Sequence, residues 1–488
     1  MSKVTTLSLL LCALSAAAGA QTTYHVAKTG NDTNAGTAAK PWKTIQHGVD
    51  TAASGDTVLV HTGNYSEQIT LKRSITLSNA PGEKPIIDGA KLTANDDGLV
   101  GIRNLSHVAV RGFTIRNYKT TNSNIAPIAI FVQGQGDDIQ LRDNTITRIQ
   151  NTGSNAANIN ALGIAVYGNG TTGPITNLVI DGNEIYGTKT GNSETLTVNG
   201  NVDGFQVTNN NIHNVNNIGI DCIGFEKTSK IAGQDFARNG LVAGNTVSHV
   251  TSATNPAYHG DRSADGIYVD GGADIIIERN IVDHADIGIE VASEHGSKNS
   301  ERITVRNNLI YASNIVGLSI GGYAKSKGGT KDCVIVNNTL YQNDTARSGS
   351  GEFQIQFNTV GNTFNNNILV ASTQGVLISN AGGAGIPIGV SSDYNLYYAA
   401  SNAEWNWLGH AYSTLATFAT GSGGDAHSLF TTPGFVSPGT LNFRLAPGSA
   451  GINAGLTLSA AIRGTLDLAG NLRVQGAAID IGFYETGA

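Results

Sequence analysis

The stretch "IERNIV", residues 277–282, belongs to a recurring pattern that decides the fold. It reads apolar, any residue, polar, Asn, any residue, apolar. The other copies are "LRDNTI" (141–146), "IDGNEI" (180–185), "VTNNNI" (207–212), "VAGNTV" (242–247), "VRNNLI" (305–310), "IVNNTL" (335–340) and "FNNNIL" (364–369). Successive asparagines of the pattern are 39, 27, 35, 35, 28, 30 and 29 residues apart. A repeat of about thirty residues predicts a solenoid in which each repeat adds one rung.

Short segments of alternating apolar residues accompany this pattern, such as "DGIYVDG" (265–271) and "IGIEVAS" (287–293). A period of two, with Asn and Gly at the corners, favours strands over helices. Asn tolerates the left-handed backbone of a tight bend, and stacked amides can bond from rung to rung. We therefore expect an all-β parallel β-helix of about ten rungs, in which the asparagines are structural. Cys222 and Cys333 fall on apolar positions and are predicted to be buried free thiols.

The two ends of the chain resemble a known group of proteins. "GNDTNAGTAAKPWKTIQHGVDTAASGDTVLVHTGNY" (30–65) and "LDLAGNLRVQGAAIDIGFYE" (466–485) are similar to segments of secreted right-handed parallel β-helix carbohydrate-active proteins, the pectate-lyase-like superfamily. The resemblance implies a right-handed β-helix, a short N-terminal capping helix within residues 41–53, and a polysaccharide as the partner. These motifs specify architecture and occur in lyases and hydrolases alike.

The chain divides into four predicted segments. Residues 1–20 carry Lys3, an apolar run and "AGA" before Gln21, which is typical of a cleavable signal peptide. The others are an N-terminal cap with the first rungs (21–100), a central β-helix with the groove (101–385), and C-terminal rungs with a closing segment (386–488). We expect a secreted or periplasmic monomer without a membrane span. A formal net charge of −7 argues against nonspecific nucleic-acid binding.

Stacking the alternating segments predicts two outward columns with acids concentrated in the middle rungs. Asp221, Tyr268, Glu290, Ser319 and Gln354 form one column; Ile223, Asp270, Ala292, Gly321 and Gln356 form the other. Like charges on neighbouring rungs destabilise a sheet unless a ligand, a metal or a shared proton compensates. We therefore interpret the acids as the floor of a glycan groove.

Loops near these rungs add further candidates. The predicted substrate-binding residues are Tyr167, His259, Arg262, Glu294, Tyr323 and Gln354. His295, Lys325 and Lys327 are candidate bases: His295 lies in the loop after Glu290, and the two lysines lie in the loop after Ile320. Function is often placed on loops held by a rigid scaffold.

The first hypothesis is β-elimination of a uronate-containing polysaccharide. Asp221, Asp265 and Asp270 would hold Ca²⁺, which the resemblance implies for lyases of this fold. His295 or a loop lysine such as Lys325 would be the base, and Tyr268 a proton donor. The sequence departs from the lyase pattern, because Glu290 stands where those lyases carry a lysine or arginine.

Two alternatives remain open. A glycoside hydrolase would use Asp270, Glu290 and Asp221 as acid and base, with no calcium requirement. A non-catalytic glycan-binding surface protein is the third possibility, against which the localised acids argue. Cationic loops suit a polyanionic chain, so the sequence favours the lyase.

Overall fold

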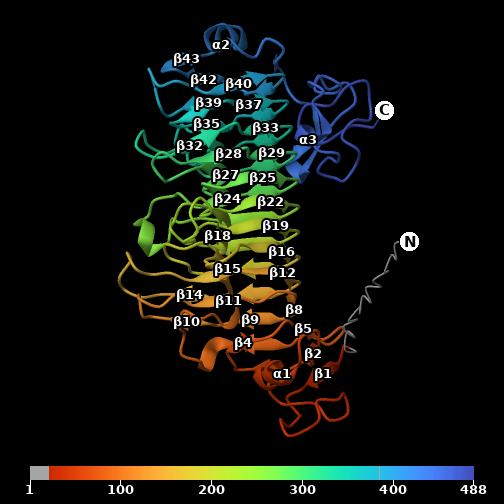
Figure 1. Ribbon diagram of the computed structural model, residues 1–488. Helices are drawn as coiled ribbons and strands as arrows, with labels where there is room; N and C mark the ends of the chain where they lie inside the picture. The colour runs from red at the N-terminus through yellow and green to blue at the C-terminus, as the bar shows by residue number, and fades with distance from the viewer. Residues whose placement is uncertain (1–20, 384, 488) are drawn as a thin grey trace, which may run out of the picture.

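The computed structural model describes residues 21–383 and 385–487, and the chain in it forms a parallel β-helix (Figure 1). Each turn contributes a strand to each of three long sheets, named sheets 1, 2 and 3 in the order in which a turn visits them. Within the described residues each sheet holds at least thirteen strands, so the stack is longer than the predicted ten or so rungs. The predicted all-β parallel β-helix is confirmed. The predicted signal peptide, residues 1–20, lies outside the described residues.

Sheet 1 carries the acidic columns. Its strands are β4 (Ile69–Leu71), β7 (Val100–Arg103), β11 (Ile128–Gln133), β15 (Leu162–Gly168), β18 (Leu196–Gly200), β21 (Ile220–Ile223), β24 (Asp265–Asp270), β27 (Ile287–Ala292), β31 (Val316–Ile320), β35 (Phe353–Ile355), β39 (Val376–Asn380), β42 (Glu404–Trp407) and β43 (His410–Tyr412). All neighbours pair in parallel except β42 and β43, which form an antiparallel hairpin at the C-terminal end.

Sheets 2 and 3 complete each turn. Sheet 2 contains β1 (Thr23–Val26), β2 (Thr57–Val60), β5 (Thr76–Asn79), β8 (Val108–Arg111), β12 (Gly136–Arg142), β16 (Ile175–Asp181), β19 (Val202–Thr208), β22 (Arg238–Ala243), β25 (Ala273–Glu278), β29 (Thr304–Arg306), β33 (Val334–Val336), β37 (Asn362–Asn365) and β40 (Val390–Asp393), with β28 (Asn299–Glu301), β32 (Gly329–Lys331) and β36 (Thr359–Val360) beside them. Sheet 3 contains β3 (Asn64–Tyr65), β6 (Ile86–Asp88), β9 (Thr114–Arg116), β13 (Thr145–Thr147), β17 (Glu184–Tyr186), β20 (Asn211–Val215), β23 (Thr246–Val250), β26 (Ile281–Asp283), β30 (Leu309–Tyr311), β34 (Thr339–Tyr341), β38 (Ile368–Val370), β41 (Leu396–Tyr398) and β44 (Leu429–Phe430). Two small sheets pair β10 (Lys119–Thr120) with β14 (Gln150–Asn151) and β45 (Phe435–Ser437) with β46 (Asn442–Leu445).

The repeated asparagine forms a buried ladder at the corner between sheets 2 and 3. The Asn280 Oδ1 atom accepts hydrogen bonds from the backbone N and the Nδ2 of Asn245, at 2.9 and 3.0 Å. Asn245 Nδ2 also donates to the carbonyl of Val207 at 2.9 Å. The preceding residue turns the corner with a positive φ, 54° at Arg279. The predicted structural role of the asparagines is confirmed.

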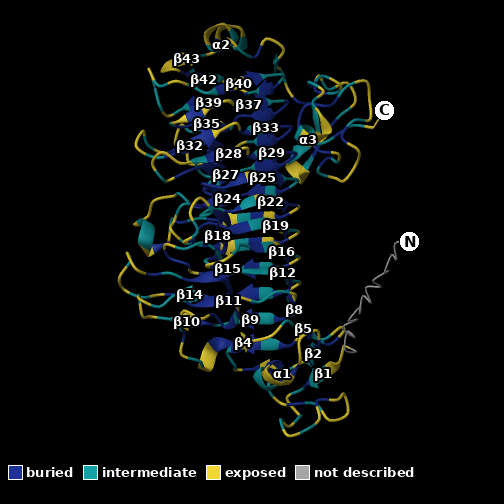
Figure 2. Cartoon of the chain, viewed as in Figure 1, coloured by how far each residue is buried: buried dark blue, intermediate teal, exposed yellow. Residues whose placement is uncertain are grey.

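The core fills the inside of the helix (Figure 2). Val269 and Val291, predicted to point inward, are fully buried, as are the free thiols of Cys222 and Cys333. Helix α1 (Ile45–Thr51) lies at the N-terminal end of the stack, within the range predicted for a cap. At the other end, Phe418 of α2 (Leu415–Ser422) stacks on Trp405 of β42.

The C-terminal segment folds back along the stack. Its helix α3 (Ala460–Arg463) lies near β29 and β33 (Figure 1), where Arg306 Nη1 donates to the carbonyl of Ala461 at 2.7 Å. The fully buried Arg473 pairs with Glu485 inside this segment. No helix among residues 21–383 and 385–487 is both long enough and apolar enough to span a membrane.

Candidate active site

Sheet 1 has the register that the sequence predicts. Asp221 pairs with Tyr268, Tyr268 with Glu290, and Glu290 with Ser319. In the second column Ile223 pairs with Asp270, and Asp270 with Ala292. The intervening residues must be apolar because they face the core, and a slip of one residue would exchange the two faces.

A cavity of about 480 Å³ lies over the outer face of sheet 1, between β15 and β27. Five carboxylates line it: Glu194, Asp221, Glu226, Asp270 and Glu294. Three tyrosines do so as well: Tyr167, Tyr258 and Tyr268. None of the described residues that line it is a lysine or an arginine. The cavity is therefore strongly acidic, with aromatic faces in its lining.

Long loops build the walls of this cavity. The loop before β24 brings in Tyr258, and the buried Asp286 fastens that loop at its base by accepting from the backbone N of Ser252 at 2.8 Å and of Ala264 at 3.3 Å. Asn255 Nδ2 donates to the carbonyl of Gly191 at 2.7 Å, which joins this loop to the one before β18.

Asp270 is held at the end of β24. Its Oδ1 accepts from the backbone N of Glu294 at 2.7 Å, and its Oδ2 lies 3.8 Å from His295 Nε2. The same nitrogen lies 3.1 Å from Glu226 Oε1. Burial, together with the charges of Glu294 and Glu226, raises the pKa of Asp270 to about 8. Asp270 is thus a proton donor at neutral pH.

Asp221 stands one rung away and is also protected from solvent. It is 3% exposed, and its Oδ1 has no hydrogen-bond partner among the described residues. Burial, followed by the charges of Glu194 and Asp270, raises its pKa well above the usual range. Tyr268 pairs with Asp221 on the neighbouring strand. Burial, followed by the charge of Asp270, raises the pKa of Tyr268 as well. A ligand with hydrogen-bond donors would satisfy the free Asp221 oxygen.

Glu290 and Asp265 form a buried pair beside the cavity and are not among its lining residues. Glu290 Oε1 accepts from Gln356 Nε2 at 2.8 Å, and the same amide donates to Ser319. Burial and mutual repulsion raise the pKa of Asp265, so the pair retains a proton. Such a shared proton explains how two acids are tolerated here.

The structure gathers some of the other predicted site residues and not others. Tyr167 and Glu294 line the cavity. Arg262 does not line it, and its Nη1 lies 3.4 Å from Asp286 Oδ1. His259 does not line it either and is exposed on the loop before β24. Gln354 donates to Ser350, and Lys325 is exposed.

Lys327 is the loop lysine related to the site. Its Nζ lies 4.8 Å from the centre of the exposed Tyr323 ring. A hydrogen bond to Tyr323, with the charges of Glu294 and Asp270 nearby, raises the pKa of Lys327.

The predicted calcium ligands do not gather at one point. Among the described residues, the group at the cavity whose donor atoms lie within 4.8 Å of one another is Glu226, Asp270 and His295, rather than Asp221, Asp265 and Asp270. Two carboxylates and an imidazole are a donor set that suits Zn²⁺ or Mn²⁺ better than Ca²⁺, which prefers oxygen ligands.

Sequence reasoning missed Glu194, Glu226, Tyr258 and the role of Gln356. Glu194 lies two residues before β18, and Glu226 lies three residues after β21. Because the sequence predicts both strands, their closeness to sheet 1 could have identified these two acids. Tyr258 lies seven residues before β24 in a long insertion, and nothing in its neighbourhood marks it.

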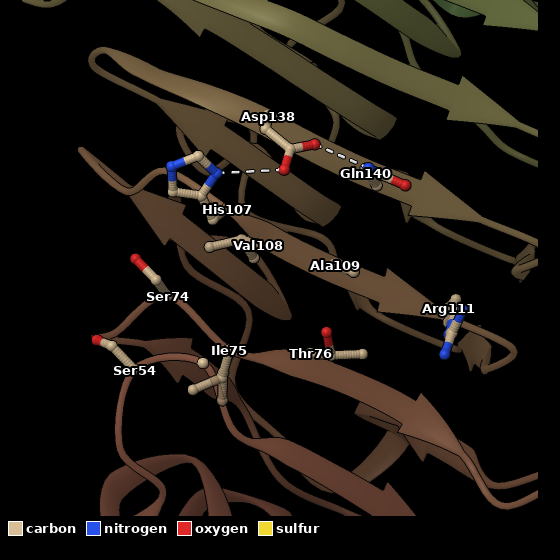
Figure 3. A pocket seen from close by; sticks show the side chains of 11 residues that line it. Ser54, Ser74, Ile75, Thr76, His107, Val108, Ala109, Arg111, Asp138 and Gln140 are labelled. Atoms are coloured by element: carbon tan, nitrogen blue, oxygen red, sulfur yellow. Dashed lines mark hydrogen bonds and ion pairs between the residues drawn. The ribbon is translucent and has the colours of Figure 1, made fainter. Parts of the chain in front are cut away.

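A second hollow, of about 600 Å³, lies over sheet 2 in the first rungs (Figure 3). His107, Asp138 and Gln140 lie together at its edge, and Arg111 lies apart from His107 and Asp138 at the end of β8. Asp138 is the one carboxylate among the described residues that line it, and it already accepts from His107 and Gln140. This hollow lacks the paired acids of the sheet 1 cavity, so we place the candidate site on sheet 1.

Comparisons with known proteins agree with the fold. A family described as "Right handed beta helix region" matches residues 129–327, and one described as "Protein of unknown function (DUF1565)" matches residues 28–80. The uncharacterized protein YwoF of Bacillus subtilis (strain 168) is 36% identical over 436 residues, which cover 87% of this chain and 91% of YwoF.

Two solved structures are similar to the chain at low sequence identity. The complex of XylC with xylose is 12% identical, with a TM-score of 0.48, and the match covers 95% of this chain and 99% of that one. Pectate lyase Pel9A is 14% identical, with a TM-score of 0.45, and the match covers 95% of this chain and 96% of that one.

Proposed function

The chain belongs to the same family as YwoF of Bacillus subtilis, and we propose that it is a glycan-cleaving enzyme that acts outside the cell. The observation that carries the proposal is the pair of buried carboxyl groups, Asp221 and Asp270, on neighbouring rungs inside one cavity. Buried acids with raised pKa values, placed in a hollow, are typical of catalytic sites. Tyrosine rings in the lining offer faces on which sugar rings can stack.

The geometry supports hydrolysis best. From the spacings of a sheet, Asp221 and Asp270 are about 8 Å apart at their Cα atoms, being one rung and two residues apart. This compares with the roughly 6.5–9.5 Å between the two carboxyl groups of inverting glycosidases, which leaves room for a water. We assign the acid to Asp270, whose carboxyl group remains protonated to a pH of about 8, and the base to Asp221, whose free Oδ1 can accept a proton.

In this reaction Asp270 gives its proton to the glycosidic oxygen while the bond to the anomeric carbon breaks. Asp221 acts in its ionised form and takes a proton from the water that attacks that carbon; its raised pKa makes this carboxylate a stronger base. The products are a new reducing end and a free hydroxyl, and exchange with solvent returns both carboxyl groups to their starting states. An acidic cavity without lysine or arginine in its lining suits a neutral glycan.

One observation favours β-elimination of a uronate glycan as the second candidate. Glu226, Asp270 and His295 could hold a divalent cation, which would neutralise the carboxylate of a uronate. Lys327 would then be the candidate base for the proton beside that carboxylate, because His295 would be bound to the cation.

The test is an assay of the purified protein on neutral and uronate polysaccharides. We would follow reducing ends and the ultraviolet absorbance of a new C4–C5 double bond in parallel, with and without a chelator. Reducing ends without absorbance, lost in Asp270→Asn and kept in the exposed control Asp274→Asn, would support the hydrolase. Absorbance that a chelator abolishes would overturn hydrolysis in favour of the lyase. Binding without either signal would point to the non-catalytic alternative.

A further inference from the structure

Two histidines stand on consecutive rungs at the edge of sheet 3, away from the acidic cavity. His249 at the end of β23 and His284 just after β26 both have a positive φ, 53° and 48°. Their strands pair so that Ser248 faces Asp283, which puts the two histidines side by side. The rings are stacked, with centroids 4.8 Å apart and an angle of 6° between their planes. The repeat of the fold thus places two imidazoles one rung apart.

A buried carboxylate fixes one of these rings. Asp283 Oδ1 lies 2.6 Å from His284 Nδ1, and the side chain of Asp283 is 11% exposed, against 50% for His284. With Nδ1 donating its proton to Asp283, the lone pair of the neutral ring is on Nε2. Metal-ligating histidines are typically held in this way by a carboxylate on the other ring nitrogen.

We propose that His249 and His284 bind a divalent transition-metal ion through their imidazole nitrogens, with Asp283 positioning His284. Donor atoms of the three residues lie within 4.8 Å of one another. Both histidines are exposed, so a rotation of the His249 ring about χ2 can direct its nitrogen to the ion while Asp283 holds the ring of His284. Imidazole donors suit Zn²⁺, Cu²⁺ or Ni²⁺ rather than Ca²⁺ or Mg²⁺, and water would fill the remaining positions.

This site is separate from the group Glu226, Asp270 and His295 at the acidic cavity, and the experiment must distinguish the two. His249 instead lines a different cavity, of about 730 Å³, whose other lining residues include Lys189 and Asn216. A metal at His249 would therefore lie beside a hollow that the proposed hydrolysis does not use.

The experiment is a calorimetric titration of the full protein with ZnCl₂, repeated for variants whose folding is checked by circular dichroism. We expect His249→Ala and His284→Ala each to weaken zinc binding at this site more than tenfold, and Asp283→Asn to weaken it about tenfold. The matched control is His213→Ala, which lies one rung before His249 in the neighbouring column and pairs with Glu184.

The outcomes separate the two metal groups. A zinc site that persists in His295→Ala and is lost in the double variant of His249 and His284 would establish the proposal. A zinc stoichiometry and affinity unchanged in that double variant, or no zinc binding by the wild-type protein, would overturn it.

Discussion

Asp270 is the residue whose protonation state decides the proposed chemistry. Its raised pKa makes it an acid at neutral pH, and a general acid contributes about 10²–10⁴-fold to a rate. We therefore expect Asp270→Asn to lower kcat by about 10³-fold while KM changes little. In the wild type, kcat/KM should fall above a pH of about 8, because Asp270 of the free enzyme loses its proton there. A pH–rate profile of wild type, Asp270→Asn and the exposed control Asp274→Asn tests this. Wild-type activity that keeps rising well above that pH would contradict the assignment.

The same carboxyl group should also make stability depend on pH. Its pKa is about 8 in the folded protein against 3.8 as the ordinary value, so the folded state binds more protons between these two pH values. The contribution of Asp270 to the free energy of unfolding should therefore be largest at low pH and fall as the pH rises through that window. Each pKa unit is worth about 1.4 kcal/mol, so the fall attributable to Asp270 is a few kcal/mol. Urea unfolding near each end of the window should show a smaller difference in Asp270→Asn than in the wild type. An equal difference in Asp270→Asn and in the exposed Asp261→Asn would contradict this linkage.

At the scale of the element, the asparagine ladder is the feature that the sequence shows most directly. Asn280 Oδ1 accepts two hydrogen bonds from Asn245, and its Nδ2 donates to Val242 and Asn308. Asn280→Ala leaves buried donors of Asn245 without an acceptor, at a cost of about 1–3 kcal/mol for each group. We expect a loss of about 3 kcal/mol or more in the free energy of unfolding, measured by urea denaturation. The exposed Asn124→Ala should change it by about 0.5 kcal/mol at most. Equal effects of the two substitutions would rule out a stabilising role for the ladder.

Strands and loops differ in how far the sequence determines them. The register of Asp221, Tyr268 and Glu290 was predictable, because their neighbours Cys222, Val269 and Val291 had to face the core. The cavity walls were not. Tyr258 reaches the site because Asn255 bonds to Gly191, 64 residues earlier, and such a contact leaves no periodic trace in the sequence. The acids on the strands could be predicted from the same alternation of inward and outward residues that predicts the strands. The residues that contact these acids from the loops could not, because their positions depend on loop conformation.

At the scale of the whole molecule, the C-terminal segment covers an outer face that would otherwise be apolar. Phe443 is 1% exposed, and its ring centroid lies 4.9 Å from that of Tyr341 on β34 and 6.1 Å from that of Tyr311 on β30. Each turn of a solenoid contacts mainly its neighbours, so the loss of this cover should remain local. Phe443→Ala removes a buried aromatic ring, which costs about 3–5 kcal/mol. We expect this variant to expose the segment after residue 430 to limited proteolysis while the acidic cavity remains active.

Mass spectrometry of the proteolytic fragments, with an activity assay on the same samples, measures both consequences. The matched control is Phe430→Ala, because Phe430 is 46% exposed and its loss uncovers little apolar surface. Cleavage confined to the C-terminal segment in Phe443→Ala, with activity retained, would show that the segment and the central rungs unfold separately. Simultaneous loss of the central strands and of activity would instead show that the cover and the stack unfold as one unit, contrary to the nearest-neighbour picture of a solenoid.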